Sequence, residues 1–199
     1  MAIKLTKRVS GIAESATLAI SAKAKQLKAE GKDIVNFGVG EPDFNTPDYI
    51  IEAAYKAMKD GRTKYTPASG IAELKKAVVE ETERATGLNY SPSQVVIGAG
   101  AKQPLYNAIA ATIEEGDEVV IPSPYWVTYP ELVKYCGGKC VFAKTKPQNG
   151  YKMTAEELES VITDNTRALI LNSPYNPSGA VYTRKELEDI VGVLEKHKN

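Results

Sequence analysis

The sequence predicts an α/β fold with three layers, α/β/α, built around a mostly parallel sheet. From residue 95 onward, short apolar runs alternate with helical patterns at the spacing of strand–helix–strand units. The run at 168–171 is apolar throughout, which is typical of a strand buried on both faces of a parallel sheet. A stiff, proline-bearing polar loop follows at 172–179. Open α/β sheets bind ligands at the carboxyl ends of their strands, so this loop is a candidate binding segment.

The first predicted helix covers residues 15–30. Ile20, Ala24 and Leu27 share one of its faces, and a glycine follows as a stop. A short strand-like run comes next, at 33–40, and it ends in glycine.

Two further helices are predicted before residue 90. Asn45 or Thr46 would cap the first, with Pro47 in its first turn. Apolar residues at helical spacing predict its buried face: Ile51, Ala54, Tyr55 and Met58. The second helix has apolar residues from Ile71 onward and stops near Gly87.

The remaining chain predicts strands that alternate with helices. The strands are expected at 95–97, 118–121, 139–144 and 167–171. The helices are expected at 102–114, around 129–135, and after two capping boxes, Thr154 with Glu157 and Thr183 with Glu186. This alternation is the main ground for the α/β prediction.

Composition excludes several classes of partner. The 199 residues, 43% of them hydrophobic, suffice for one domain or for one domain and part of another. Lys+Arg and Asp+Glu both total 25, so no net charge draws the chain to nucleic acid or to an anionic membrane surface. No apolar run approaches the ~20 residues of a membrane span. The amino terminus lacks the apolar core of a secretory signal.

The cysteine and histidine content argues against a metal site. Cys136 and Cys140 are the only cysteines and His197 is the only histidine. A C-x-x-x-C pair with one remote histidine is a poor set of zinc ligands, so no metal is expected. The sparse cysteines fit a reduced, cytoplasmic protein.

Three strand–helix connections carry candidate ligand-binding groups. Small residues at 98–101 lead into a helix, whose free N–H groups and positive dipole end suit a phosphate. Trp126, the only tryptophan, follows the strand at 118–121 and can stack on a planar ring. Asn176 lies in the loop at 172–179. Packing explains the small-residue turn about as well, a tryptophan is more often a packing residue, and the loop at 172–179 could be a proline-rich connector. Together, the three features predict a flat, phosphorylated ligand.

Five segments resemble a known family. They are N-F-G-V-G-E-P-D-F-N-T-P at 36–47, K-Y-T at 64–66, G-A-G-A-K-Q-P-L-Y-N at 98–107, G-D-E-V-V-I-P-S-P-Y-W at 116–126 and N-S-P-Y-N-P-S-G at 172–179. The chain resembles the amino-terminal half of a fold-type I, pyridoxal-phosphate-dependent aminotransferase. It is most similar to the bacterial aspartate aminotransferase branch of class I. The segments follow the family's order and spacing across nearly the whole chain.

The resemblance implies a role for each matching position towards the cofactor, pyridoxal 5′-phosphate. Gly100, Ala101 and Lys102 correspond to the turn and helix start that bind its phosphate. Trp126 resembles the aromatic residue stacked on its pyridine ring. Asn176 matches the asparagine that hydrogen-bonds its phenolic oxygen.

The resemblance also implies substrate-binding residues and a partner. Gly40 resembles the glycine whose backbone lies against the substrate's α-carboxylate, and Trp126 and Asn176 are implied to contact the substrate too. Tyr65 matches a tyrosine that reaches the phosphate bound by the partner subunit, so a homodimer is implied.

Small departures from the family pattern leave these roles intact. Ala101 stands where glycine is common, which preserves the N–H group, and Ser178 replaces a usual threonine. By the same analogy, the Ser123–Pro124 and Asn176–Pro177 peptide bonds are expected to be cis.

The resemblance further implies what these 199 residues do not contain. In the family, the lysine that binds the cofactor covalently, the acidic partner of the pyridine nitrogen and the arginine that holds the α-carboxylate all follow the matched segment. We therefore expect no catalytic residue within this chain and no turnover by it alone. The implied domains are an arm with part of the small domain at 1–45 and the first part of the large cofactor-binding domain at 46–199. An incomplete sheet would leave an unpaired edge and uncovered apolar surface.

The function implied is transfer of an amino group between an amino acid and a 2-oxo acid. Aspartate with 2-oxoglutarate is the first expectation, followed by aromatic or prephenate-type acceptors. Two alternatives stay open. One is another fold-type I enzyme, such as a lyase or synthase, because a fold does not determine a reaction. The other is a non-catalytic module that binds an anion or a partner protein.

Overall fold

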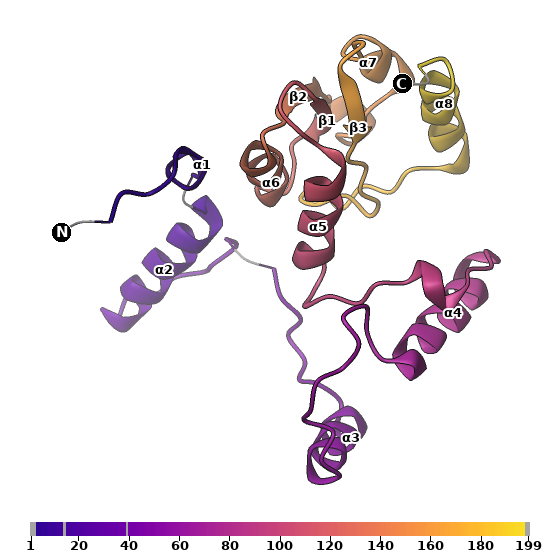
Figure 1. Ribbon diagram of the computed structural model, residues 1–199. Coiled ribbons are helices and arrows are strands. Elements are labelled where there is room, and N and C mark those ends of the chain that lie inside the picture. The colour runs from indigo at the N-terminus through magenta and orange to yellow at the C-terminus, as the bar shows by residue number, and fades with distance from the viewer. Residues whose placement is uncertain (1–2, 14, 39, 198–199) are drawn as a thin grey trace. The chain divides into compact units, whose positions relative to one another are not determined.

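The structure, a computed structural model, describes residues 3–13, 15–38 and 40–197 (Figure 1). The chain divides into two units. Met1–Ala13 with Leu105–Asn199 make the sheet unit, and Glu14–Pro104 make the helical unit. The helical unit extends across residue 45, and the predicted division into 1–45 and 46–199 stays a prediction. Among the described residues, no helix is both long and apolar enough to cross a membrane.

The sheet unit is built on three parallel strands. β1 (Glu118–Ser123) is central, with β2 (Lys139–Lys144) on one side and β3 (Thr166–Leu169) on the other. Glu118, the first residue of β1, lies opposite the first residue of each neighbouring strand. The three strands predicted after residue 115 are confirmed, to within two residues at their ends. The α/β class follows from this parallel arrangement with helices between the strands.

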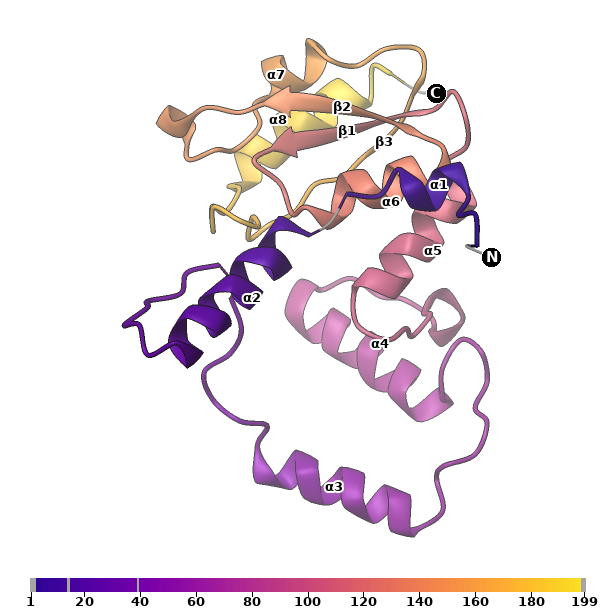
Figure 2. The same cartoon turned by 90° about the vertical axis from the view of Figure 1, so that its left-hand side faces the viewer.

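Helices cover both faces of this sheet (Figure 2). α6 (Thr128–Cys136) and the carboxyl half of α5 (Lys102–Thr112) pack on one face. α7 (Ala155–Glu159) and α8 (Arg184–Leu194) pack on the other. Two short elements complete the described part of the unit, α1 (Lys7–Ser10) and η2 (Pro147–Asn149).

The hydrophobic core has two clusters, one on each face of the sheet. One contains Ile109, Ile113, Val119, Ile121, Tyr129 and Val133. The other contains Val120, Ala143, Met153, Leu158, Tyr182, Ile190 and Val193. Successive residues of a strand point to opposite faces, so β1 contributes to both clusters. Val119, Val120 and Ile121 are 0% exposed, and burying each such side chain stabilises the fold by about 1.5–3 kcal/mol.

Both predicted capping boxes are present. The Glu157 N–H donates to Thr154 Oγ1 at 3.2 Å, and the Thr154 N–H donates to Glu157 Oε2 at 3.0 Å. At the start of α8, the Thr183 N–H donates to Glu186 Oε2 at 2.7 Å. The Lys152 ammonium also donates to Glu186, so this carboxylate ties α8 to the segment that precedes α7.

The helical unit contains the three helices predicted before residue 90. They are α2 (Ala16–Ala29), α3 (Asp48–Lys59) and α4 (Ala72–Thr86), and a short helix η1 (Pro92–Gln94) follows them. Gly87 ends α4 with a φ of 74°, a left-handed conformation that glycine adopts without steric cost.

Two predictions about α3 are wrong. Pro47 is its N-cap residue, with an extended backbone, and no side chain of Asn45 or Thr46 caps the helix. The face predicted to be buried is exposed at all four of its residues: Ile51, Ala54, Tyr55 and Met58. The reason is that no element in the described part of the helical unit packs on that face.

The prediction of a strand at 95–97 is also wrong. A strand forms only where a neighbour accepts and donates its backbone hydrogen bonds. Here the Ile97 N–H donates to the Ser69 carbonyl at 3.0 Å, within an irregular segment. The run at 33–40 is likewise not a strand over its described residues, and residue 39 lies outside them.

Ile121→Ala should lower the free energy of unfolding by about 2–5 kcal/mol, because the side chain is fully buried in one of the two core clusters. Val191→Ala, at a position on α8 that is 50% exposed, is the matched control. It should change the same quantity by less than about 0.5 kcal/mol. Urea unfolding followed by circular dichroism measures both variants. Equal losses would contradict the core described above.

Glu186→Gln should reduce the acid sensitivity of the fold. The Lys152 ammonium, and after it the Thr183 N–H, lower the pKa of Glu186 from 4.5 to about 2. Because the folded pKa lies below the unfolded one, the carboxylate stabilises the fold above the unfolded pKa. This contribution is lost as the pH falls towards the folded value.

The slope of unfolding free energy against pH, measured between about pH 5 and pH 2, should therefore be smaller in Glu186→Gln. Glu188→Gln is the control, since Glu188 pairs with Arg184 of the same helix at 3.4 Å. Glu186→Gln should show a smaller slope than this control. An unchanged slope in Glu186→Gln would contradict the prediction.

Candidate functional site

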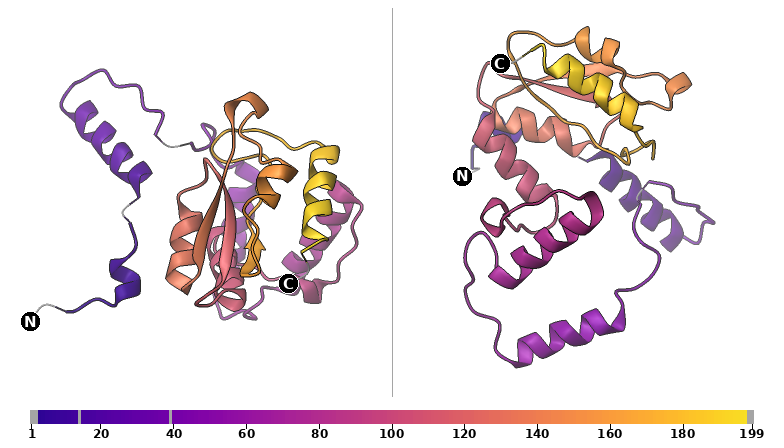
Figure 3. Two further views of the ribbon diagram at one scale, coloured as in Figure 1. Left: turned by 90° about the horizontal axis from the view of Figure 1, so that it is seen from above. Right: turned by 90° about the vertical axis from the view of Figure 1, so that its right-hand side faces the viewer.

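The strand order of this sheet reverses between the carboxyl ends of β1 and β3. The chain passes from β1 through α6 to β2, then returns through α7 to β3 on the other side of β1. After β1 it continues into α6 on one face, and after β3 into α8 on the opposite face (Figure 3, left). Two loops therefore leave neighbouring strands in opposite directions. In open α/β sheets such a switch point is where ligands bind.

Trp126 lies in the loop after β1. Its side chain is half-buried, and its ring meets the ring of Tyr129 edge-on at 5.4 Å between centroids. The Tyr129 N–H donates to the Trp126 carbonyl at 3.0 Å. The preceding residue, Tyr125, stacks on Phe142 of β2 at 4.9 Å between centroids. The indole is thus held at the carboxyl end of β1 by the strand and helix beside it.

Asn176 lies in the loop after β3, and it is exposed. Its N–H donates to Asn172 Oδ1 at 2.9 Å, so the side chain at the start of the loop bonds to the loop's own backbone. The Asn176–Pro177 and Ser123–Pro124 peptide bonds are cis, as the resemblance implied, and Ser173–Pro174 is also cis. Both predicted residues of the sheet unit therefore lie at the switch point.

Tyr175 ties the Asn176 loop to β1, the strand that leads into the Trp126 loop, and the sequence analysis missed it. It is 3% exposed, whereas its neighbours Pro174 and Asn176 are exposed. Its hydroxyl donates to the Pro122 carbonyl of β1 at 2.5 Å. Burial raises the pKa of Tyr175, so the phenol stays protonated and remains a donor. The signal in the sequence was an aromatic residue inside an otherwise polar loop.

The predicted phosphate-binding residues lie in the helical unit, where α5 begins. Gly100 has a φ of 68°, Ala101 is in a turn, and Lys102 is the first residue of the helix. All three are exposed. The first N–H groups of a helix have no acceptor within the helix, so they are available to an anion.

The residues around this turn hold it in one shape. Gln103 Oε1 accepts the Ala99 N–H at 2.6 Å. A Cβ atom on Gly98 would lie 2.6 Å from the ring of Pro104, so a side chain at this position would displace the proline. Glycine is therefore required where the chain enters α5.

The remaining predicted residues, Gly40 and Tyr65, also belong to the helical unit and are exposed. The structure brings together the loops of Trp126 and Asn176 within one unit. Five predicted residues belong to the helical unit: Gly40, Tyr65, Gly100, Ala101 and Lys102. Their membership of the same site stays a prediction.

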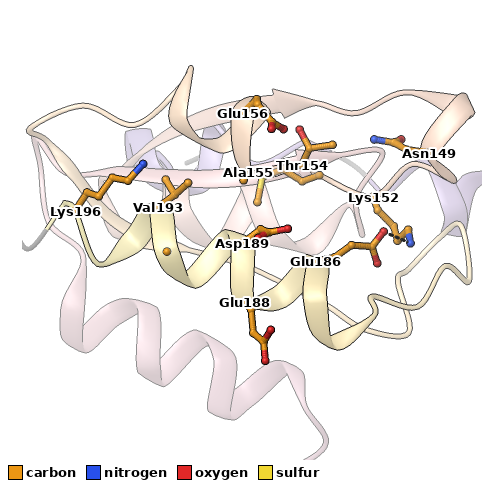
Figure 4. Close-up of a pocket in the computed structure, with 12 residues that line it drawn as sticks. Asn149, Lys152, Thr154, Ala155, Glu156, Glu186, Glu188, Asp189, Val193 and Lys196 are labelled. Carbon is orange, nitrogen blue, oxygen red and sulfur yellow. Dashed lines mark hydrogen bonds and ion pairs between the residues drawn. The ribbon is translucent and has the colours of Figure 1, made fainter.

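A hollow of about 560 Å³ lies elsewhere, between η2, α7 and α8 (Figure 4). It contains none of the predicted residues. Its lysines pair with acidic side chains: Lys152 pairs with Glu186, and Lys196 with Glu159 at 3.6 Å. Because these charges already compensate one another, we assign the candidate site to the switch point.

Within the described ranges, no group of three or more His, Cys, Asp or Glu side chains could hold a metal ion. Cys136 and Cys140 are free thiols that pack against the first core cluster. Burial raises the pKa of both thiols, so neither is an activated nucleophile.

Comparison with known proteins identifies the family. Residues 32–199 match the model of the class I and II aminotransferases. The chain is 49% identical to the aspartate aminotransferase of Bacillus subtilis, over 98% of this chain and 50% of that protein. It is also 49% identical to the aspartate/prephenate aminotransferase of Cereibacter sphaeroides, over 97% of this chain and 48% of that protein. The chain thus spans about half the length of the curated relatives it matches.

Solved structures agree with these relatives. The aspartate aminotransferase of Thermus thermophilus with maleate superposes with a TM-score of 0.94 at 42% identity, over 99% of this chain and 52% of that chain. The alanine aminotransferase of Pyrococcus furiosus gives a TM-score of 0.92 at 31% identity, over 98% of this chain and 50% of that chain. The chain therefore belongs to the class I and II aminotransferase family.

Proposed function

We propose that this protein is a pyridoxal-phosphate-dependent aminotransferase, which moves an amino group between an amino acid and a 2-oxo acid. One observation carries the proposal: Trp126 and Asn176 follow neighbouring strands at the switch point of a parallel sheet. A stacking plane and an amide at one sheet edge suit a flat, hydrogen-bonding ring better than they suit a simple anion.

The donor set fits the cofactor on its chemistry. The indole of Trp126 would lie against the pyridine ring, and the exposed amide of Asn176 would donate to the phenolic oxygen. The exposed turn at Gly100, Ala101 and Lys102 would hold the phosphate through the N–H groups that begin α5. When bound, the cofactor supplies a ring that withdraws electrons from the substrate's α-carbon.

We propose that the remaining residues orient the substrate. The backbone of Gly40 would lie against the α-carboxylate, and Asn176 would help to hold that group. Tyr65 would reach the phosphate site of a second subunit, so a homodimer is part of the proposal. Aspartate with 2-oxoglutarate is the proposed pair, with aromatic or prephenate-type acceptors next. The names of the relatives, aspartate and aspartate/prephenate aminotransferases, support this order.

The proposal assigns no catalytic residue to these 199 residues. Lys102 begins the phosphate-binding helix, which gives it a different role from the lysine that attaches the cofactor. The chain's own contribution is to bind and orient the ring, the phosphate and the substrate carboxylate.

Pyridoxine 5′-phosphate should quench the fluorescence of Trp126, the only tryptophan in the chain. This probe has the cofactor's ring and phosphate but no aldehyde, so it cannot attach to surface lysines. Inorganic phosphate should compete with it but bind about 2–10-fold more weakly, because aromatic stacking adds about 0.5–1.5 kcal/mol. A titration with N-acetyltryptophanamide corrects for light absorbed by the probe.

Two variants separate the parts of the proposed site in this titration. Lys102→Ala should weaken the binding of both ligands, whereas Asn176→Ala should weaken only that of the ring-bearing one. Equal affinity for the two ligands would contradict the cofactor role and favour a phosphate-binding module. Absence of any quenching in the unmodified chain would contradict the cofactor role.

With pyridoxal phosphate, aspartate and 2-oxoglutarate, the chain alone should show no turnover. Absorbance should show no stoichiometric band of lysine-bound cofactor, because no catalytic lysine is assigned to these residues. Borohydride reduction followed by peptide mapping should find the label spread over several lysines. One lysine labelled to a full equivalent, with amino-group transfer, would contradict this assignment.

A further inference from the structure

We propose that Tyr175 is a positioning residue that fixes the Asn176 loop to the end of β1, from which the Trp126 loop leaves, so that both side chains meet one ligand at a constant spacing. The inference rests on the proposed function, in which Trp126 and Asn176 bind the same ring. Tyr175 itself would touch no ligand and would act through its neighbour.

Tyr175 is held at three points, each of which restrains Asn176. Its hydroxyl donates to the Pro122 carbonyl at 2.5 Å. Its N–H donates to the Ala180 carbonyl at 2.8 Å, and its own carbonyl accepts the Gly179 N–H at 2.6 Å. The two backbone bonds close the loop on itself, but only the hydroxyl ties the loop to β1. Without it, the loop would keep these two backbone bonds and lose its hydroxyl bond to the strand beside it.

The end of β1 also accepts a hydroxyl hydrogen bond on its other side, from the chain that follows β2. The Ser123 carbonyl accepts the hydroxyl of Thr145, which follows β2, at 2.6 Å. Consecutive carbonyls at the end of β1 thus receive one hydroxyl from each flank, from Tyr175 on the β3 side and from Thr145 on the β2 side. Three residues separate Pro122 from Trp126 and two separate Ser123 from it, so the position of the indole depends on the position of this strand end.

The burial of Tyr175 makes the attachment strong. It is the one buried residue between 172 and 179, in a loop whose other side chains are exposed or half-buried. A hydrogen bond shielded from water is less easily exchanged for one to solvent. The Pro122 residue that accepts it is also buried, so loss of the hydroxyl would leave a buried carbonyl without this donor.

Tyr182 offers a matched control. It is 6% exposed, and its hydroxyl oxygen accepts the Met153 N–H at 2.8 Å. It packs in the core cluster beneath α7 and α8, and its hydroxyl bonds to Met153, in the segment before α7, rather than to β1. Tyr182→Phe therefore removes the same atoms as Tyr175→Phe, from an equally buried position, without releasing either loop.

The binding test uses the full chain and pyridoxine 5′-phosphate, with Trp126 fluorescence as the readout. Tyr175→Phe should raise the dissociation constant about tenfold, and Tyr182→Phe should change it by less than about twofold. Circular dichroism and urea unfolding of both variants ensure that folded chains are compared. Equal affinities in the two variants would overturn the inference while leaving the proposed function intact. Failure of the unmodified chain to bind would instead count against the proposed function.

A double-variant cycle tests whether Tyr175 acts through Asn176. In the Asn176→Ala background, Tyr175→Phe should weaken binding by less than about twofold, because the group that it positions is already absent. A purely structural role would give the same tenfold loss in both backgrounds, which would overturn the inference.

A measurement without ligand tests independently whether the Tyr175 hydroxyl holds the strand end that leads to Trp126. Acrylamide should quench Trp126 more strongly in Tyr175→Phe than in the unmodified chain, because the strand end that holds the indole loses one of its two hydroxyl contacts. Tyr182→Phe should leave this quenching constant unchanged. If Tyr175→Phe also leaves it unchanged, the connection between the two loops is refuted even where no ligand binds.

Discussion

The pairing of β1 with a parallel neighbour on each edge is the constraint on which the sheet unit depends. β1 is the only described strand with a partner on both sides, and its apolar residues supply both core clusters. Parallel crossovers are right-handed, so moving from β1 to β2 and then back past β1 to β3 places α6 and α7 on opposite faces of the sheet. Packing also constrains the tight turn between α6 and β2, because a Cβ on Gly138 would lie 2.5 Å from the Ile113 side chain.

The candidate site is a consequence of that arrangement. Its loops extend from the ends of two paired strands, where hydroxyl groups donate to backbone carbonyls. The hollow between η2, α7 and α8 contains lysines that already pair with acidic side chains, which makes it a less suitable centre for chemistry. Rigid strands with functional loops are the general solution by which one fold serves many reactions.

The two units differ in how far each buries its own apolar residues. The described residues of both core clusters belong to the sheet unit. In the helical unit, α3 has a clear apolar face, yet Tyr55 and Met58 on that face are each 58% exposed. Periodicity in a sequence specifies that a face can be buried, and it does not specify what buries it.

The sequence by itself determined the elements whose causes are local or nearly so. The capping boxes at Thr154 and Thr183, the apolar runs of three strands and the family motifs all lie within a few neighbouring residues, so they could be recognised in order along the chain. The same reasoning failed at 95–97, because a strand needs a partner that the pattern of the strand itself does not reveal.

Only the tertiary structure decided which loops meet. Trp126 and Asn176 were predictable as candidates, but their shared position at the switch point depends on the strand order, which no short segment contains. The hydrogen bond of Tyr175 to Pro122 joins residues 53 positions apart, and such a contact exists only once β1 and β3 are side by side. The sequence thus specified the binding groups, and the pairing of the strands specified their spacing.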